Sequence, residues 1–424
     1  MRRLLLLLLA VFAWLVSPAA HAAEPGAQLS ISLLTMGPGE HPFTKFGHSA
    51  LWVHDAATQR DEVYNYGTFA FHSRTALLDS IQGTLPYWLS VQSMRGTLHT
   101  YAGQGRSLLA SELELTPAER VQLYAALRDN ARPEHRYYRY DYYRDNCSTR
   151  VRDVVDSVLR GPMRQQMTQP ATMSYREHTQ RLVADDLLLY AVLDLAVGRE
   201  TDSRLSFFDE AWLPERLHAL FARTTVIRDG QRLPLIRSER TLLGSRFSPP
   251  RSVPPRWGTR YAALGFGLGS CFAALGLFAR PGRAALRRTL AVLYIVLGTT
   301  LGLLGCAICY LTFFSAHSAA ASNFNVLLLP PWLLALSVAG FGVMRGKARA
   351  FLLARWAALG ALLASTLALC LHALSNPQAN LQELALTLPL WLGVALSTRQ
   401  PGRVFWGFAE QSAPPSRSCS ATAR

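Results

Sequence analysis

Cysteine is scarce in this chain of 424 residues, and its six cysteines are unevenly distributed. Only Cys147 lies between the N-terminal apolar stretch and the strongly apolar second half of the sequence. The other five lie in or beyond that half: Cys271, Cys306, Cys309, Cys370 and Cys419. Cys147 has no possible partner in the first half. This excludes a disulfide there within one chain and leaves a single thiol to be explained.

Acidic residues are almost absent from the second half. Residues 257–424 contain 13 Lys and Arg but only 2 Asp and Glu, whereas residues 23–256 contain 28 and 26. The formal net charge of +15 is therefore concentrated in the apolar half, where it reflects membrane topology and gives no support to nucleic-acid binding. The sequence also has no internal repeat, acidic run or long low-complexity tract. We predict no nucleic-acid partner.

The N-terminus has the three parts of a secretory signal peptide. "MRRLLLLLLAVFAWLVSPAAHAA" combines two arginines, an apolar run and small residues before a cleavage point, which assigns residues 1–22 to the signal. The mature chain is then expected to start near Ala23. An uncleaved membrane anchor is the alternative, although the apolar run is short for a span.

A Pro- and Arg-rich linker, "SPPRSVPPRW" at 248–257, separates a domain at 23–247 from a membrane bundle at 258–398 and a cytoplasmic tail at 399–424. We predict about five helices in the bundle, at 261–279, 289–314, 324–344, 351–374 and 384–397. The first four runs are long enough to cross a bilayer at about 1.5 Å per residue. The fifth is short and contains Pro389. The spacings Gly265/Gly269 and Gly298/Gly302 predict close helix packing.

The loops between these runs alternate in charge. Residues 280–288 and 345–349 are rich in Arg and Lys, whereas residues 315–323 and 375–383 contain neither. Because basic loops stay in the cytoplasm, the domain before the first span is predicted to be periplasmic. The localisation expected is a multi-pass protein of the bacterial inner membrane with its first domain in the periplasm.

Cys147 is predicted to lie in the first turn of a helix. "VRDVVDSVL" at 151–159 has apolar residues with helical spacing, and Asp145 or Asn146 is a suitable N-cap. The helix dipole and unpaired N–H groups would stabilise a thiolate there and later an oxyanion. The alternative is a buried cysteine that only packs, as most free cysteines do. Cys306 and Cys309 form a C-x-x-C pair in an apolar run without charged or histidine neighbours, for which packing is the better interpretation.

A base for this thiol is available on a predicted hairpin. "KFGHSALWVHD" at 45–55 and "EVYNYGTF" at 62–69 have strand character. If these strands pair, His48 can face the start of the Cys147 helix while Asn65 orients its imidazole, a Cys-His-Asn arrangement. The alternatives are a strand histidine with a satisfied hydrogen bond and a turn asparagine beside Gly67.

Four segments carry a family resemblance: "FGHSAL", "VYNYGTF", "RYDYYRDNCSTRVRDVV" and "LDLAVGRETDSRLSFFDEAWLPERL". In this order they resemble the Lnb N-terminal periplasmic domain family over about residues 28–225. That family is similar in chain order to permuted papain-like enzymes of the NlpC and lecithin:retinol acyltransferase kind. The fold class implied is α+β, a permuted papain-like domain followed by an all-α bundle. The resemblance implies Cys147 as nucleophile, His48 as base and Asn65 as the third member.

The resemblance also implies a reaction. Lnb proteins are expected to move an acyl chain from the glyceryl part of a lipoprotein's lipid to the amino group of its N-terminal cysteine. This is thiolate attack on an ester, a thioester intermediate and then aminolysis, and it needs no metal or cofactor. The partners expected are therefore a lipid or lipoprotein substrate and the bilayer itself. Many proteins share such a periplasmic domain, so the acyl acceptor stays open.

Further polar residues are candidates for substrate binding. Tyr66 and Arg150 belong to the motifs of Asn65 and Cys147. "FFSAHSAAASNFNVLLLPPW" places His317, Asn323 and Asn325 in a loop on the predicted periplasmic side. They could hold a lipid headgroup or contact the catalytic domain. The alternative is a polar loop that caps two helices.

Two other functional classes stay open. A periplasmic cysteine peptidase or amidase acting on cell-wall peptide would use the same thiol and base, with a polar groove in place of an acyl-sized apolar pocket. A non-catalytic membrane scaffold would tolerate Cys147→Ser. The many aromatic residues near the motifs favour lipid, although aromatic residues at such spacing also form cores.

The alternating loop charges generate a topology prediction. A periplasm-dependent alkaline phosphatase fused after Arg288 should be inactive, because that loop is expected in the cytoplasm. The same reporter fused after Ala320, in a loop without basic residues, should be active. Phosphatase activity of the first fusion would overturn the proposed orientation.

Overall fold

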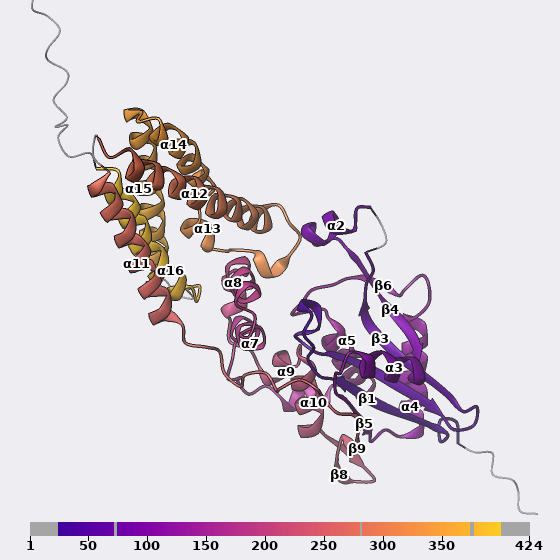
Figure 1. Ribbon diagram of the computed structural model, residues 1–424. Coiled ribbons are helices and arrows are strands. Elements are labelled where there is room, and N and C mark those ends of the chain that lie inside the picture. The colour runs from indigo at the N-terminus through magenta and orange to yellow at the C-terminus, as the bar shows by residue number, and fades with distance from the viewer. Residues whose placement is uncertain (1–23, 72–73, 280–281, 374–376, 400–424) are drawn as a thin grey trace, which may run out of the picture. The chain divides into compact units, whose positions relative to one another are not determined.

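The structure is a computed structural model that describes residues 24–71, 74–279, 282–373 and 377–399 (Figure 1). The predicted signal peptide at 1–22 and all but the first residue of the predicted tail lie outside the described residues. The chain divides into two compact units. The first contains the residues up to Pro255 together with Leu311–Ser322, and the second contains Arg256–Tyr310 and the residues from Asn323 onward. The chain thus combines an N-terminal sheet domain with a C-terminal helical region.

The first unit is built on a seven-stranded antiparallel sheet with the strand order β6-β4-β3-β2-β1-β5-β9 (Figure 1). The strands are β1 (Leu29–Met36), β2 (His48–Asp55), β3 (Arg60–Thr68), β4 (Pro86–Ser93), β5 (Leu108–Leu113), β6 (Tyr137–Arg139) and β9 (Ile236–Leu243). A separate hairpin pairs β7 (Thr225–Arg228) with β8 (Gln231–Pro234). The central strands β1 to β4 follow one another both in the chain and in the sheet, whereas β5, β6 and β9 join the sheet edges through longer connections.

Both faces of the sheet are covered, because side chains alternate along each strand. Leu33 and Leu51 point into the core beneath α4, α5 and α10, whereas Leu34 and Ala50 point to the face covered by α3. The helices of this unit are α2 (Ala76–Gln82), α3 (Met94–Gly103), α4 (Pro117–Asn130), α5 (Cys147–Val158), α6 (Pro162–Gln166), α7 (Tyr175–Leu182), α8 (Leu187–Ala196), α9 (Phe207–Glu210) and α10 (Pro214–Arg223).

The predicted hairpin of the histidine segment is confirmed. β2 and β3 pair antiparallel, with Leu51 opposite Tyr64. The pairing of β3 with β4 shifts register between Asn65 and Thr68. Gly67 lies within this irregularity at φ +84°, a conformation that other residues rarely adopt. The bulge therefore ends the regular ladder next to Asn65 and turns the strand at that point.

The predicted helix after Cys147 is also confirmed. α5 begins at Cys147 and buries Val151, Val155 and Val158 against β2 and β3, as its apolar spacing requires. Its N-cap is Asn146, one of the two residues considered for this position. The helix is therefore anchored to the sheet along one face and has its N-terminus beside the strand that begins with His48.

The second unit contains four helical segments long and apolar enough to cross a membrane: Gly258–Phe278, Ala284–Phe313, Asn325–Met344 and Ala348–Leu371. They correspond to α11, α12, the pair α13 (Asn325–Leu328) and α14 (Leu334–Met344), and α15. A 3-10 turn at Pro331–Leu333 interrupts the third segment, because proline lacks the N–H that a continuous helix needs. The fifth predicted helix, α16 (Leu381–Ser397), has 17 residues and is shorter than the four candidate spans.

Glycines allow the helices of this unit to approach closely, as their spacing predicted. A Cβ on Gly265 or Gly269 of α11 would lie 2.4 Å or 2.3 Å from a backbone oxygen of α16. A Cβ on Gly298 or Gly302 of α12 would likewise lie too close to atoms at the start of α14. Figure 1 shows α11 and α16 side by side. Backbone contact of this kind replaces the hydrophobic driving force that is missing between helices in lipid.

These contacts predict a position-specific effect on stability. Gly269→Leu should lower the melting temperature of the detergent-solubilised protein by the equivalent of about 1–3 kcal/mol, because the added side chain separates α11 from α16. Gly267→Leu is the matched control, since a Cβ at Gly267 meets no atom within 4 Å. If both variants melt at the wild-type temperature, the α11–α16 contact is not formed as described.

Candidate active site

The start of α5 is held by a single side chain. The Asn146 Oδ1 atom accepts hydrogen bonds from the backbone N–H of Ser148 at 2.8 Å and of Thr149 at 2.9 Å. Its Nδ2 atom donates to the carbonyl oxygens of Tyr142 at 2.8 Å and Trp212 at 2.9 Å. Asn146 is 4 % exposed and uses both ends of its amide. The first residue of the helix, Cys147, is therefore fixed in place by the residue before it.

His48 and Asn65 lie close together on neighbouring strands. The His48 Nε2 atom is 3.3 Å from the Asn65 Oδ1 atom. The Asn65 Nδ2 atom donates to the carbonyl oxygen of Val63 at 3.2 Å, so the amide oxygen is the end that faces the imidazole. An amide oxygen can only accept, which assigns the proton to Nε2 and leaves Nδ1 as the proton acceptor of the neutral ring.

The surroundings of Cys147 lower the pKa of its thiol. It is 7 % exposed, and burial alone would raise the pKa of the thiol. The charge of His48 and its hydrogen bond to the thiol act in the opposite direction. Hydrogen bonds from the Ser49 N–H and the Ser148 hydroxyl add to them, and the thiol pKa falls from 9.0 to about 7. The structure thus brings Cys147, His48 and Asn65 into one cluster.

Two tyrosines, Tyr138 and Tyr140, interact electrostatically with the thiol. A Cβ on Gly67 would lie 3.0 Å from the Tyr140 ring, which is tight, and 3.6 Å from the Cys147 Cβ atom, an ordinary contact. Burial and the charge of Cys147 raise the pKa values of Tyr140 and Tyr138 above the ordinary value. Both phenols stay neutral near pH 7. They therefore bring no negative charge close to the thiol.

Tyr66 and Arg150, expected to bind substrate, have other partners. Tyr66 is 2 % exposed, packs in the core under α5 and accepts a hydrogen bond from Asn130 at 2.8 Å. Arg150 forms a bidentate ion pair with Asp145 at 2.6 Å and 2.8 Å. Its guanidinium also lies 3.7 Å from the centroid of the Tyr138 ring. Both side chains are therefore engaged in holding the surroundings of α5.

His317 belongs to the first unit. Its Nε2 atom lies 3.0 Å from the carbonyl oxygen of Ser80, and its ring stacks on Tyr142 at 5.9 Å. The backbone N–H of the preceding residue, Ala316, donates to the carbonyl oxygen of Gln82 at 2.7 Å. The segment Leu311–Ser322 is thereby attached to the end of α2 by both backbone and side chain.

Asn323 and Asn325 belong to the second unit. Asn323 accepts a hydrogen bond from Gln378 at 3.1 Å, and Asn325 accepts one from Asn380 at 2.9 Å. All four side chains are at least 98 % buried, given exposed fractions of 0–2 %. These amides join two loops of the helical unit. This arrangement resembles the polar-loop alternative more than an open headgroup site.

One buried residue that interacts electrostatically with the thiol, Arg106, was not singled out in the sequence. Arg106 is 4 % exposed, donates from Nε to the carbonyl oxygen of Gly37 at 2.7 Å and lies 4.7 Å from the Tyr101 ring centroid. Its Nη2 atom has no hydrogen-bond partner among the described residues. Burial lowers the pKa of Arg106, while the charges of Tyr101 and Cys147 favour the charged form. A buried cation therefore lies close enough to Cys147 to favour its thiolate.

The fourth family motif supplies support for Asn146. Trp212, whose carbonyl oxygen binds Asn146, packs its ring edge-on against Tyr143 at 4.8 Å. Just before it, Glu210 pairs with the fully buried His178 at 2.8 Å. The residues "DEAW" at 209–212 are thus part of the scaffold under α5. The sequence alone does not reveal this role, because the partners of these residues lie more than 30 positions away in the chain.

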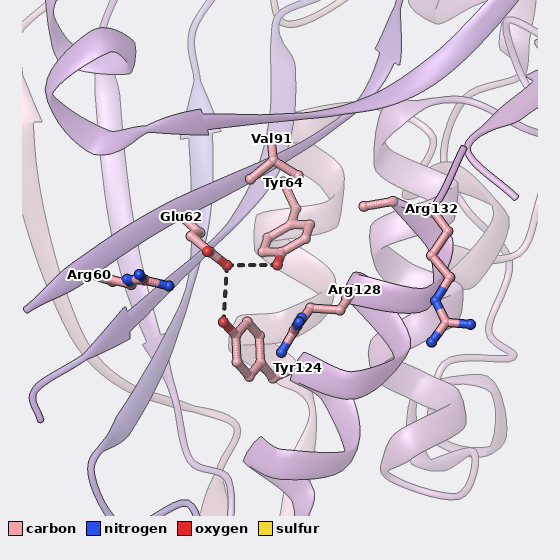
Figure 2. A pocket seen from close by; sticks show the side chains of 8 residues that line it. Arg60, Glu62, Tyr64, Val91, Tyr124, Arg128 and Arg132 are labelled. Carbon is pink, nitrogen blue, oxygen red and sulfur yellow. Dashed lines mark hydrogen bonds between the residues drawn. The ribbon is translucent and has the colours of Figure 1, made fainter. Parts of the chain in front are cut away.

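A separate pocket of about 290 Å³ opens between β3 and α4 and is shown in Figure 2. At its centre Glu62 accepts hydrogen bonds from Tyr64 at 2.8 Å and Tyr124 at 3.1 Å. Its other lining residues are Arg60, Val91, Arg128, Ala131 and Arg132. The pocket contains none of the three clustered residues, and we do not assign the thiol chemistry to it.

Comparison with protein families agrees with the two-unit arrangement. Residues 18–181 match the Lnb N-terminal periplasmic domain, and residues 271–400 match the Lnb transmembrane domain. No curated protein and no solved structure matches the chain, so the permuted papain-like fold stays a prediction. The two matches follow each other in the order expected from the sequence and include Cys147, His48 and Asn65 in the first. The chain belongs to the Lnb family, as a multi-pass membrane protein with a periplasmic N-terminal domain.

Proposed function

We propose that this protein is a cysteine acyltransferase of the bacterial inner membrane that acts from the periplasm on an ester of a lipid or lipoprotein. The observation that carries the proposal is the Cys147 thiol at the start of α5, with a pKa of about 7 and His48 as its partner. A structural cysteine has no need of a paired base. The order of histidine strand before cysteine helix also fits the permuted papain-like enzymes that the sequence resembles.

In the first half of the reaction, the His48 Nδ1 atom takes the thiol proton. The Cys147 thiolate attacks the ester carbonyl carbon and forms a tetrahedral oxyanion. Collapse of this intermediate breaks the bond to the glyceryl oxygen, which leaves as an alcohol after receiving the proton from the imidazolium. The acyl chain is then held as a thioester on Cys147. Asn65 keeps the imidazole in the required tautomer throughout.

In the second half, an amine attacks the thioester carbonyl and loses a proton to His48. The Cys147 sulfur leaves as a thiolate, and the acyl chain becomes an amide. His48 then returns a proton to the thiolate, which restores the starting state. An N-terminal amino group of a lipoprotein is the acceptor that the family resemblance implies, and no metal or cofactor takes part in this scheme.

The oxyanion requires N–H donors, and the N-cap limits which ones are available. Asn146 already binds the N–H groups of Ser148 and Thr149. The N–H of Cys147 itself is the first-turn donor left for an oxyanion. The unpartnered Nη2 of Arg106 is a second candidate, because this guanidinium feels the charge of the thiolate. The site thus combines one backbone donor with one buried cation.

The lowered pKa of the Cys147 thiol predicts a pH profile. Alkylation of Cys147 by iodoacetamide should reach half its maximal rate near pH 7, because a lowered pKa makes the thiolate available above that pH. His48→Ala should move the midpoint upward by about one pH unit or more. The matched control is His54→Ala on the same strand, whose ring contacts Asp61 at 2.9 Å.

The labelled peptide must be identified by mass spectrometry, since Cys271 and Cys370 are exposed and will also react. A midpoint above pH 8 in the wild-type protein, or an identical midpoint in the His48→Ala variant, would contradict the pairing of thiol and base.

The proposed chemistry predicts a trapped intermediate. Without an amine acceptor, the solubilised protein incubated with diacyl lipopeptide or phospholipid should carry an acyl chain on Cys147, visible in the intact mass of its peptide and removed by hydroxylamine. Cys147→Ser should abolish the labile adduct, whereas Cys271→Ser should retain it. If no adduct forms on folded protein with a reactive Cys147, and muropeptides are cut instead, the protein is a cell-wall hydrolase.

A further inference from the structure

The first unit has exposed apolar side chains on α2 and at the end of α12, which is a candidate membrane span. Leu77, Leu78 and Ile81 of α2 are 67 %, 57 % and 43 % exposed. Phe313 and Phe314, at the end of α12 and just after it, are 64 % and 72 % exposed. We call these five side chains the apolar rim. Exposed apolar patches of this kind mark contact with other proteins or with membranes.

Hydrogen bonds within the first unit hold the two parts of the rim together. The Ala316 N–H donates to the carbonyl oxygen of Gln82, the last residue of α2, at 2.7 Å. The His317 ring reaches the carbonyl oxygen of Ser80 at 3.0 Å. A Cβ on Gly83 would lie 3.1 Å from His317, so the contact is tight. The exposed face of α2 and the residues after α12 therefore form one surface.

Chain continuity identifies what this surface meets. α12 (Ala284–Phe313) is a candidate membrane span with mean hydropathy 2.2, so we expect the residues that follow it directly near the bilayer surface. α2 is attached to those residues. We propose that the apolar rim is seated in the outer surface of the bilayer, with Leu77, Leu78 and Ile81 of α2 in contact with lipid. Burial of apolar side chains in the interface would stabilise this position.

A row of aromatic rings connects the rim with the thiol. His317 stacks on Tyr142 at 5.9 Å, and Tyr142 meets Tyr140 edge-on at 5.7 Å. Tyr140 and Cys147 both approach Gly67 closely. An acyl chain that leaves the bilayer at the rim would pass these ring faces before reaching Cys147. This part of the inference rests on the proposed function, whereas the lipid contact of the rim does not.

Photocrosslinking of the full-length protein tests the lipid contact directly. p-Benzoylphenylalanine would replace Leu78 in protein reconstituted into nanodiscs of phosphatidylethanolamine and phosphatidylglycerol. Val121 of α4, 40 % exposed in the same unit, is the control position. Lipid adducts at position 78 should exceed those at position 121 roughly tenfold or more, because only the first is expected to contact the bilayer. Equal yields, or crosslinks from position 78 only to the protein itself, would overturn the proposal.

A charge-insertion variant tests whether the rim serves the reaction. The double variant Leu77→Glu with Leu78→Glu should slow Cys147 acylation by nanodisc lipid roughly tenfold, because carboxylates are disfavoured in the interface. Alkylation of Cys147 by iodoacetamide should be unchanged, which shows that the fold is intact. Val121→Glu should affect neither rate. If the proposed acyltransferase function is wrong, no variant is acylated, yet crosslinking at position 78 still reports the lipid contact.

Discussion

The site depends on the hydrogen bonds of Asn146. This side chain satisfies two N–H groups at the start of α5 and, through its amide nitrogen, ties that start to the carbonyl oxygens of Tyr142 and Trp212. Buried polar atoms are costly when left unpaired, so the arrangement has few alternatives of similar energy. It fixes where Cys147 lies relative to β2. The contact with Trp212 also makes the position of the thiol dependent on residues far along the chain.

That dependence gives a structural role to the segment around Trp212, which lies outside the residues that match the Lnb periplasmic domain. Trp212 is held by packing against Tyr143 and Tyr175, and Glu210 pairs with a buried histidine beneath it. Nearby, the fully buried Arg176 binds Asp194 at 2.8 Å and Asp202 at 2.7 Å. Removing one partner of such a buried pair leaves an uncompensated charge, which costs about 3–5 kcal/mol. The motif "LDLAVGRETDSRLSFFDEAW" therefore supports the site without entering it.

Much of the site could be predicted from sequence because its signals are local. The helix after Cys147 and its N-cap follow from neighbouring residues, and the hairpin joins His48 to Asn65 over only 17 positions. Arg106 could not be found in this way. It reaches the site by donating to Gly37, 69 positions earlier in the chain, and nothing in its neighbourhood marks it as buried. The interrupted third span was similarly hidden, since hydropathy does not register where Pro330 and Pro331 break the helix.

The opposing effects on the pKa of the Cys147 thiol support the proposed reaction with a lipid ester. Full burial would raise the pKa of Cys147, and a base, a backbone N–H and a hydroxyl act together to lower it to about 7. A structural thiol would gain nothing from these groups. In the proposed reaction the burial of the sulfur would protect the thioester, because it also excludes water. Ring faces accept an acyl chain without losing hydrogen bonds, whereas a peptide bound there would leave its amides unpaired. A thiol that is both buried and activated is thus suited to carry an apolar group such as the acyl chain of the proposed thioester.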